Sequence, residues 1–357
     1  MERRAVDRPA SWLGLPTEKA LPGLLSYFQA DGLSALRRQL QDDVVAVELP
    51  CSFPHSSAIY SALQFAKVSA GTNEERTLTA AGFFEDYEDP DTVGDFDWPD
   101  PAKYIHPEAC RRAVQPVDDR AVLGMLWSCH FQDACAAFGM ETALIKMLTE
   151  PEMFRAVIDR ITEFYLRANE IFYEAAYRQL DAVLIGNDFG TQTGLMLSAA
   201  HLREFVFPGT KKLVDQAKRY GLKVIHHSCG SIADVIPDLI ALGVDAIHPI
   251  QALAAGMDPV SLQRNFGNRV SFCGGVDAQQ LLVHGTPEEV RQKVRELKAI
   301  FPTGLVISPS HEAILPDIPP ANIRALFEAV RSEAWRRRNA YAGWRVPATL
   351  PSRRSGQ

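Results

Sequence analysis

The stretch Lys223–Ile250, KVIHHSCGSIADVIPDLIALGVDAIHPI, decides the fold class. It holds a short apolar run at residues 223–227, a helical pattern at 232–242 and a second apolar run at 246–250. A strand, a helix and another strand in this order form the unit of a parallel sheet with right-handed crossovers. The stretch therefore predicts an α/β protein built on parallel strands.

The same alternation continues on both sides of this stretch. Further strands are predicted at residues 44–49, 122–127, 182–186, 270–273 and 305–308, and further helices from about residue 198 and at residues 259–266, 287–300 and 321–337. Two helix starts, at Thr149 and Thr286, have threonine as the N-cap, proline close behind and glutamate three residues after the cap, the pattern of a capping box. The sequence thus predicts the sheet and its crossover helices together.

No low-complexity linker divides the chain, so we expect one domain over residues 1–345. An acidic and aromatic stretch at 83–104 interrupts the N-terminal half, and it is read either as a lid or as a surface excursion. The tail at 346–357 is expected to be frayed.

Composition and charge exclude several classes of protein. Hydrophobic residues make up 46% and charged residues 23%, which is typical of a globular protein. The net charge of -7 gives no reason to expect nucleic acid or an anionic membrane as partner, and a small uncharged or cationic substrate suits it better. With neither a signal peptide nor a membrane span in view, we expect a cytoplasmic protein whose six cysteines are reduced. The oligomeric state stays open.

Polar residues follow five consecutive predicted strands, where a parallel barrel places its ligand site. The segments are 187–188, 227–230, 249–251, 274–277 and 309–312. His227 and Cys229 are two apart on an extended backbone, so their side chains point to the same side and suit a zinc ion. His311 is the preferred third ligand, and Cys273 is the alternative.

Structural readings stand beside these assignments. A single His-x-Cys pair also occurs as ordinary packing, and His226 and His248 are expected to pack or form hydrogen bonds. Asp188 and Asp277 could cap the segments that follow them. The remaining cysteines are expected to be ordinary buried thiols, at positions Cys51, Cys110, Cys129 and Cys135.

The segments 227–230, 240–245, 249–251, 274–277, 285–290 and 311–322 together resemble the uroporphyrinogen decarboxylase-like superfamily. The resemblance covers about half of the chain and implies a (β/α)8 barrel. True decarboxylases of the superfamily carry an arginine-rich motif, Met-Arg-Gln-Ala-Gly-Arg, that holds substrate carboxylates. The nearest counterpart here, at residues 8–14, lacks both of its arginines, which weakens the decarboxylase reading.

The zinc methyltransferase branch, with its corrinoid-dependent and coenzyme M-dependent members, carries His-x-Cys-Gly at the position of His227–Gly230. The resemblance to this branch implies a zinc that activates a thiol acceptor. A cysteine in Pro-Gly-Cys completes that site, whereas this chain has Pro309, Ser310 and His311. Decarboxylases also have a histidine there, so His311 could instead contact substrate without a metal.

We therefore expect a zinc-dependent methyltransferase or demethylase that moves a methyl group between a small methylated substrate or corrinoid and an acceptor. His227, Cys229 and His311 would hold zinc, Asp188 and Asp277 would orient substrate or move protons, and Gln192 and Gln251 would donate or accept neutral hydrogen bonds. A corrinoid could serve as co-substrate or ride on a partner protein. The alternatives are a metal-free decarboxylase of a porphyrinogen or other carboxylate, and a non-catalytic barrel that binds a tetrapyrrole or corrinoid.

Overall fold

The computed structural model describes residues 6–54, 56–65, 79–114 and 119–332. Its main sheet has eight strands, each parallel to its neighbours, in the order β1-β9-β8-β7-β6-β5-β4-β3. The strands are β1 (Ala10–Ser11), β3 (Val44–Glu48), β4 (Ala121–Trp127), β5 (Ala182–Gly186), β6 (Lys223–His227), β7 (Ala246–Ile250), β8 (Ser271–Val276) and β9 (Leu305–Pro309). A two-stranded sheet pairs β2 (Leu15–Pro16) with β10 (Ala313–Ile314).

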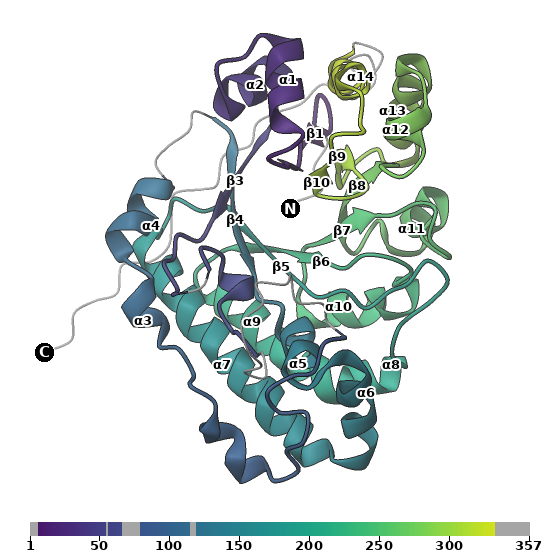
Figure 1. Cartoon of the computed structure of the whole chain (residues 1–357). Helices are drawn as coiled ribbons and strands as arrows, with labels where there is room; N and C mark the ends of the chain where they lie inside the picture. Colours follow the sequence, from purple (N-terminus) through teal and green to yellow (C-terminus); the bar gives the residue numbers. More distant parts are fainter. Residues whose placement is uncertain (1–5, 55, 66–78, 115–118, 333–357) are drawn as a thin grey trace, which may run out of the picture.

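The large sheet curls into a nearly closed barrel, which brings its two edge strands, β1 and β3, toward each other (Figure 1). Asp43, directly before β3, donates its backbone N–H to the carbonyl of Ser11 in β1 at 3.1 Å, which links the two edges of the sheet. The expected (β/α)8 barrel is therefore confirmed.

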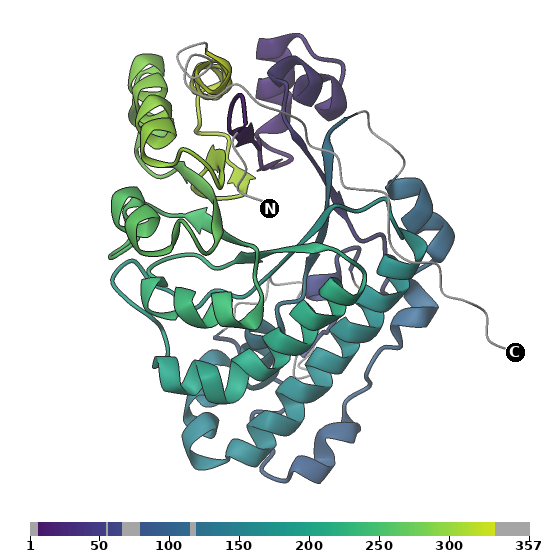
Figure 2. The ribbon, with the colours of Figure 1, turned by 180° about the vertical axis from the view of Figure 1, so that it is seen from behind.

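Helices surround the strands, as the two opposite views show (Figures 1 and 2). The α-helices are α1 (Leu21–Phe28), α2 (Leu33–Leu40), α3 (Pro101–Tyr104), α4 (Pro107–Ala113), α5 (His130–Phe138), α6 (Met140–Thr149), α7 (Pro151–Ala175), α8 (Ala199–His201), α9 (Phe207–Arg219), α10 (Ile236–Leu242), α11 (Pro259–Phe266), α12 (Leu281–His284), α13 (Pro287–Ile300) and α14 (Pro320–Arg331). Shorter turns are η1 (Ile59–Ser61), η2 (Pro90–Asp95), the π-helical η3 (Leu202–Val206) and η4 (Ala233–Val235). None of the described helices combines the length and apolar character that a bilayer crossing requires.

The two predicted capping boxes differ in outcome. Thr286 caps α13 as expected, with its hydroxyl accepting from Glu289 N and the Glu289 carboxylate accepting from Thr286 N. The prediction for Thr149 is wrong, because this residue ends α6 and the N-cap of α7 is Glu150. The hydroxyl of Thr149 instead donates to the carbonyl of Ile145 within α6, at 3.2 Å.

An aspartate stands directly before β3, before β5 and before β7, and all three make the same contacts. Each carboxylate accepts the backbone N–H of a residue in the neighbouring strand at 2.8 Å, and each aspartate N–H donates to the carbonyl of that same residue. The pairs are Asp43 with Ser11, Asp181 with Val122 and Asp245 with Val224. These double contacts set the register of three strand pairs at the amino ends of the strands.

The acidic and aromatic stretch at 83–104 is anchored to the outside of the barrel (Figure 1). Phe83, Phe84, Phe96 and Trp98 pack on one another, and the guanidinium of Arg160 in α7 lies 5.2 Å from the Trp98 ring. Lys146 in α6 donates to the backbone carbonyl of Tyr87 at 2.7 Å. Phe84 also packs on Phe138 in α5, so the aromatic residues of this stretch extend the main core on the outside of the barrel. The tail at 346–357 lies outside the described residues.

Candidate metal centre

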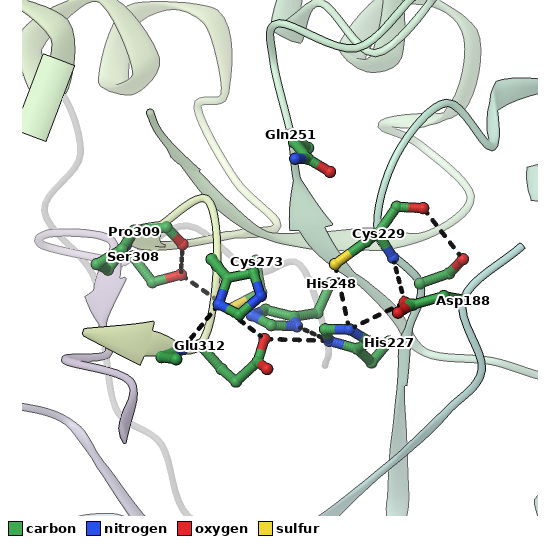
Figure 3. A network of polar contacts seen from close by, with 12 residues as sticks. Asp188, His227, Cys229, His248, Gln251, Cys273, Ser308, Pro309 and Glu312 are labelled. Carbon is green, nitrogen blue, oxygen red and sulfur yellow. Dashed lines mark hydrogen bonds and ion pairs between the residues drawn. The ribbon is translucent and has the colours of Figure 1, made fainter. Parts of the chain in front are cut away.

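Polar side chains from the carboxyl ends of several strands converge at one mouth of the barrel (Figure 3). His227 is the last residue of β6, and Asp188 and Cys229 lie two residues beyond the ends of β5 and β6. His248 lies in β7 directly opposite His227, and Glu312 follows β9. This is the end at which barrel enzymes place their active sites.

Two electron-rich atoms face the same nitrogen of His227 (Figure 3). Its Nε2 lies 3.5 Å from Cys229 Sγ and 3.3 Å from Asp188 Oδ1. The Asp188 carboxylate also accepts the backbone N–H of Cys229 at 2.8 Å, which fixes the loop. One ligand atom from each of the three residues lies within 4.8 Å of the other two. The expected pairing of His227 with Cys229 is thus present, and Asp188 joins it.

The other nitrogen of His227 faces a second group of residues. Its Nδ1 lies 2.9 Å from Nδ1 of His248 and 3.5 Å from Oε2 of Glu312. His248 was expected to pack or form hydrogen bonds, and it does form one. Sequence reasoning gave Glu312 no role, although it lies in one of the polar segments that follow the strands. Glu312 comes close to His227 because of the turn that the chain makes after β9, and the sequence does not show that turn.

Two glycines allow the Asp188 and Cys229 loops to approach each other. Gly230 has φ +79°, in the left-handed region, and a Cβ there would lie 2.5 Å from the carbonyl carbon of Gly190. The side chain of Gln251 accepts the N–H of Gly230 at 2.6 Å, and the hydroxyl of Ser228 accepts the N–H of Phe189 at 2.9 Å. The Gly230 turn expected from the sequence therefore holds Cys229 against Asp188.

Charges within the cluster shift the pKa values of its members. Burial acts to lower the pKa of His227, but Asp188, Cys229 and Glu312 together raise it well above its usual value. Burial acts to raise the pKa of Asp188, and the hydrogen bond and charge of His227 outweigh this and lower it to about 2. Burial likewise acts to raise the pKa of Cys229, yet contacts with His227 and His311 bring it below its usual value. The site therefore favours a thiolate and a carboxylate beside one imidazole.

His311 lies at this mouth but makes a different set of contacts. Its Nδ1 accepts the backbone N–H of Ala313 at 3.0 Å and lies 3.7 Å from Glu312 Oε2. A hydrogen bond with the Cys229 side chain, ahead of the opposing effect of burial, raises its pKa. His311 belongs to neither of the two groups of mutually close ligand atoms found among the described residues.

The alternative third ligand, Cys273, faces the interior of the barrel. It belongs to the small apolar cluster around Trp12 and Leu184, with Sγ 3.4 Å from the hydroxyl of Ser308. Burial raises the pKa of its thiol to about 12. Cys273 is also absent from both groups of close ligand atoms in the described part of the chain.

The remaining predicted site residues lie apart from His227. The Asp277 carboxylate accepts the backbone N–H groups of Gln279, Gln280 and Leu281, so it caps the turn that leads into α12. This was the structural alternative for Asp277. Gln192 is exposed on the loop after β5, where its backbone carbonyl accepts from Ala255 N. Gln251 is buried and holds the Gly230 backbone.

Comparison with known proteins places this chain in a family. The family model described as uroporphyrinogen decarboxylase (URO-D) matches residues 69–333. A methylated-thiol–coenzyme M methyltransferase of Methanosarcina mazei is 30% identical over 161 residues, which make up 44% of this chain and 40% of that protein. A uroporphyrinogen decarboxylase of Chlorobium limicola is 28% identical over 244 residues, 64% of this chain and 65% of the relative. The chain thus spans less than two thirds of each of these relatives.

One solved structure shares the fold over almost the whole chain. A methyltransferase from Methanosarcina mazei superposes with a TM-score of 0.67 at 15% identity, covering 91% of this chain and 94% of that one. At this identity the likeness speaks for the barrel alone. The architecture seen here is therefore shared with a solved enzyme.

Proposed function

The chain belongs to the uroporphyrinogen decarboxylase family, and we propose that it is a zinc-dependent methyltransferase or demethylase. It would move a methyl group between a small methylated substrate or a corrinoid and an acceptor. The relative from Methanosarcina mazei is named a methylated-thiol–coenzyme M methyltransferase, which supports this choice within the family. In this proposal, a corrinoid carried by a partner protein can serve as the methyl donor or acceptor.

The observation that carries the proposal is that Asp188 and Cys229 face the same nitrogen of His227. In a Cys-His-Asp triad, the thiol and the carboxylate contact opposite nitrogens of the ring, and the carboxylate orients the imidazole. Glu312 already faces Nδ1 of His227 in that orienting position, so a triad would leave Asp188 without a role. Two anionic groups at one nitrogen are better explained by a cation between them. The geometry therefore favours a metal ligand set over a nucleophile triad.

The spacing of these atoms fits zinc. A tetrahedral zinc with bonds of about 2.0–2.3 Å places its ligand atoms roughly 3.5 Å apart. The observed separations from His227 Nε2 are 3.3 Å to Asp188 and 3.5 Å to Cys229. Nitrogen, sulfur and oxygen are all donors that zinc accepts in catalytic sites, where a fourth position stays open. His311, beside Cys229, is a further candidate ligand in place of Asp188.

The residues around the site have defined tasks in this proposal. Glu312 and His248 face Nδ1 of His227, so they orient the ring and keep its Nε2 directed at the metal position. Gln251 and Gly230 hold the loop of Cys229, and Gln192 is proposed as a neutral contact for substrate. Bound zinc supplies a Lewis acid that lowers the pKa of a thiol or polarises a methyl ether oxygen.

Decarboxylation of a porphyrinogen is the second candidate function, because several relatives are named uroporphyrinogen decarboxylases. Arg8, the arginine in the segment that corresponds to the substrate-binding motif, forms an ion pair with Asp43 at the amino end of the strands. That is the end opposite His227. A substrate with several carboxylates needs cationic partners at the mouth, and Arg8 does not supply one.

Metal analysis of purified protein tests the proposal. We expect about one zinc per chain. Cys229→Ala should remove most of the zinc and any methyl transfer while the barrel stays folded, because its large apolar core does not depend on a metal. Cys273→Ala is the matched control. This variant should keep its zinc, since the Cys273 thiol is hydrogen-bonded to Ser308 inside the barrel. Full metal content in Cys229→Ala would refute the proposed ligand set.

A further inference from the structure

Trp127 ends β4 in a backbone conformation that large side chains rarely adopt. Its φ is +45°, and that of the next residue, Ser128, is +53°. The pairing of β4 with β5 also shifts register between Met125 and Trp127, as a β-bulge does. Bulges and left-handed backbone next to an active site serve to redirect a side chain. The fold thus directs the Trp127 indole toward the mouth.

The Trp127 ring contacts two other rings, each close to perpendicular to it. The imidazole of His227 lies 5.4 Å away at an interplanar angle of 77°, and the phenol of Tyr60 lies 6.3 Å away, also at 77°. Tyr60 is 47% exposed, so this side of the arrangement is open to solvent. Trp127 and Tyr60 therefore form two aromatic walls that meet at a right angle beside His227.

The Trp127 side chain also has an unused polar atom. Its indole Nε1 is buried and has no hydrogen-bond partner among the described residues. A buried donor without an acceptor is costly, and a ligand that carries an oxygen would satisfy it. This points to an occupant of the aromatic corner.

The charge around the corner is negative. Among the described residues, the ion pairs of Asp188 and Glu312 are made with histidines, and none is made with lysine or arginine. Burial and then the charge of Glu48 raise the pKa of Tyr60, so Glu48 also acts on this region. A zinc ion held by the Cys229 thiolate and the Asp188 carboxylate would be neutralised by them. Two further carboxylates, Glu48 and Glu312, would then remain at the mouth, with His311 3.7 Å from Glu312.

We propose that this mouth binds a small methylated cation, a quaternary ammonium or a sulfonium compound, and that Trp127 and Tyr60 are the walls that recognise it. Aromatic faces attract methylated cations electrostatically, and carboxylates nearby add to that attraction. This inference rests on the proposed function: the cation would give one methyl group to a thiolate acceptor, which becomes a methyl thioether, and would leave as a neutral tertiary amine or thioether. Binding at this mouth would place the methyl groups beside His227, at the proposed metal position.

Calorimetric titration of the zinc-loaded full chain with choline tests the cation preference. The comparison ligand is the neutral dimethylbutanol in which a carbon atom replaces the nitrogen, so shape and hydroxyl are kept and only the charge is lost. We expect choline to bind roughly two- to thirtyfold more tightly, the range that cation–π contacts provide. Equal binding of the two compounds would overturn the proposal.

Variants of Tyr60 test whether its ring contacts the cation, because this exposed residue can be changed without disturbing the core. Tyr60→Leu should lose most of the preference for choline, whereas Tyr60→Phe, which keeps the ring, should retain it. The matched control is Tyr177→Leu, since Tyr177 is 49% exposed and follows α7 on the outer side of the barrel. Trp127→Leu should lose the preference too, with zinc content as the check on folding. An unchanged preference in Tyr60→Leu would refute the assignment.

The two proposals fail in different ways. Normal zinc content and methyl transfer from a neutral donor, without choline binding, would overturn the cation site and leave the methyltransferase standing. Choline binding with the expected preference in a protein that takes up no zinc would support the aromatic corner and overturn the zinc-dependent function.

Discussion

The imidazole rings of His227 and His248 meet through like atoms, with their Nδ1 atoms 2.9 Å apart. One of these atoms must carry the proton and the other must accept it. Glu312, a carboxylate that only accepts, also faces Nδ1 of His227 at 3.5 Å. The proton therefore belongs on His227 Nδ1, and His248 is the acceptor. The raised pKa of His227 places a second proton on Nε2, between Asp188 and Cys229, and a bound zinc would replace that proton.

Replacing His248 by leucine should weaken zinc binding but leave the proposed ligands His227, Cys229 and Asp188 in place. Loss of a partner that orients a metal-binding histidine lowers affinity by about 10- to 100-fold. Competition with a chelator of known affinity measures the change. His226→Leu is the control, because His226 is equally buried but stacks on Phe189 and makes no hydrogen bond within the described residues. Equal losses in both variants would mean that His248 acts only through packing.

Thr286→Ala should destabilise the protein by about 1 kcal/mol, because it removes the N-cap of α13. Thr149→Ala should have a much smaller effect on the free energy of unfolding, since Thr149 ends α6 and caps no helix start. Both residues are exposed threonines that precede a proline-started helix, so they form a matched pair. Urea unfolding of the two variants measures the difference, and equal costs would contradict it.

The buried Asp133 in α5 should make stability fall as pH rises. Burial raises its pKa from 3.8 to about 8, although the hydroxyl of Tyr165 donates to its carboxylate and acts in the opposite direction. Because the folded protein holds this proton more tightly than the unfolded chain does, the group favours folding at low pH. That contribution is lost as pH rises from the unfolded pKa toward the folded one.

Asp133→Asn removes this titration and keeps an oxygen that can accept from Tyr165. We expect the variant to match the parent most closely at about pH 4 and to exceed it by on the order of 1–3 kcal/mol at about pH 8. Urea unfolding at the two pH values checks the sign. A difference between the two proteins that does not change with pH would show that Asp133 is already ionised in the folded state.

Uroporphyrinogen should be turned over at a negligible rate, because the one arginine of the corresponding segment, Arg8, is bound to Asp43 away from the mouth. Incubation under reducing conditions, with an authentic decarboxylase in parallel, measures the product by chromatography. Coproporphyrinogen formed at an ordinary enzymatic rate would reverse the ranking of the two candidate functions.

The longer strands could be predicted from the sequence because burial on both faces makes them continuous apolar runs. The bounds of β5, β6 and β7 agree with the prediction. β1 was not predicted, since Ala10 and Ser11 are too short a segment to show any periodicity. β8 extends to Val276, beyond the predicted end at residue 273, because Gly274 and Gly275 continue to pair with β9 in positive-φ conformations. From the sequence alone, two consecutive glycines predict a turn. Only their pairing with β9 shows that the strand continues through them.

The site could be predicted as far as local geometry determines it. His227 and Cys229 share one strand end, so period-two spacing was enough to place them together. Glu312 and Trp127 reach His227 from strands that are distant in sequence, through a turn after β9 and a bulge in β4. The turn and the bulge arise from contacts between strands. No residue pattern near Glu312 or Trp127 predicts them.

The aspartates before β3, β5 and β7 hold neighbouring strands in register at the end of the barrel opposite His227. The loops that carry Asp188 and Cys229 take no part in these contacts, so their length and sequence can vary while the strands keep their alignment. The strands therefore form a scaffold on which the loops of the candidate site can be exchanged. Grafting the loops of a relative onto these strands, or evolving them in the laboratory, should change the substrate before it unsettles the barrel.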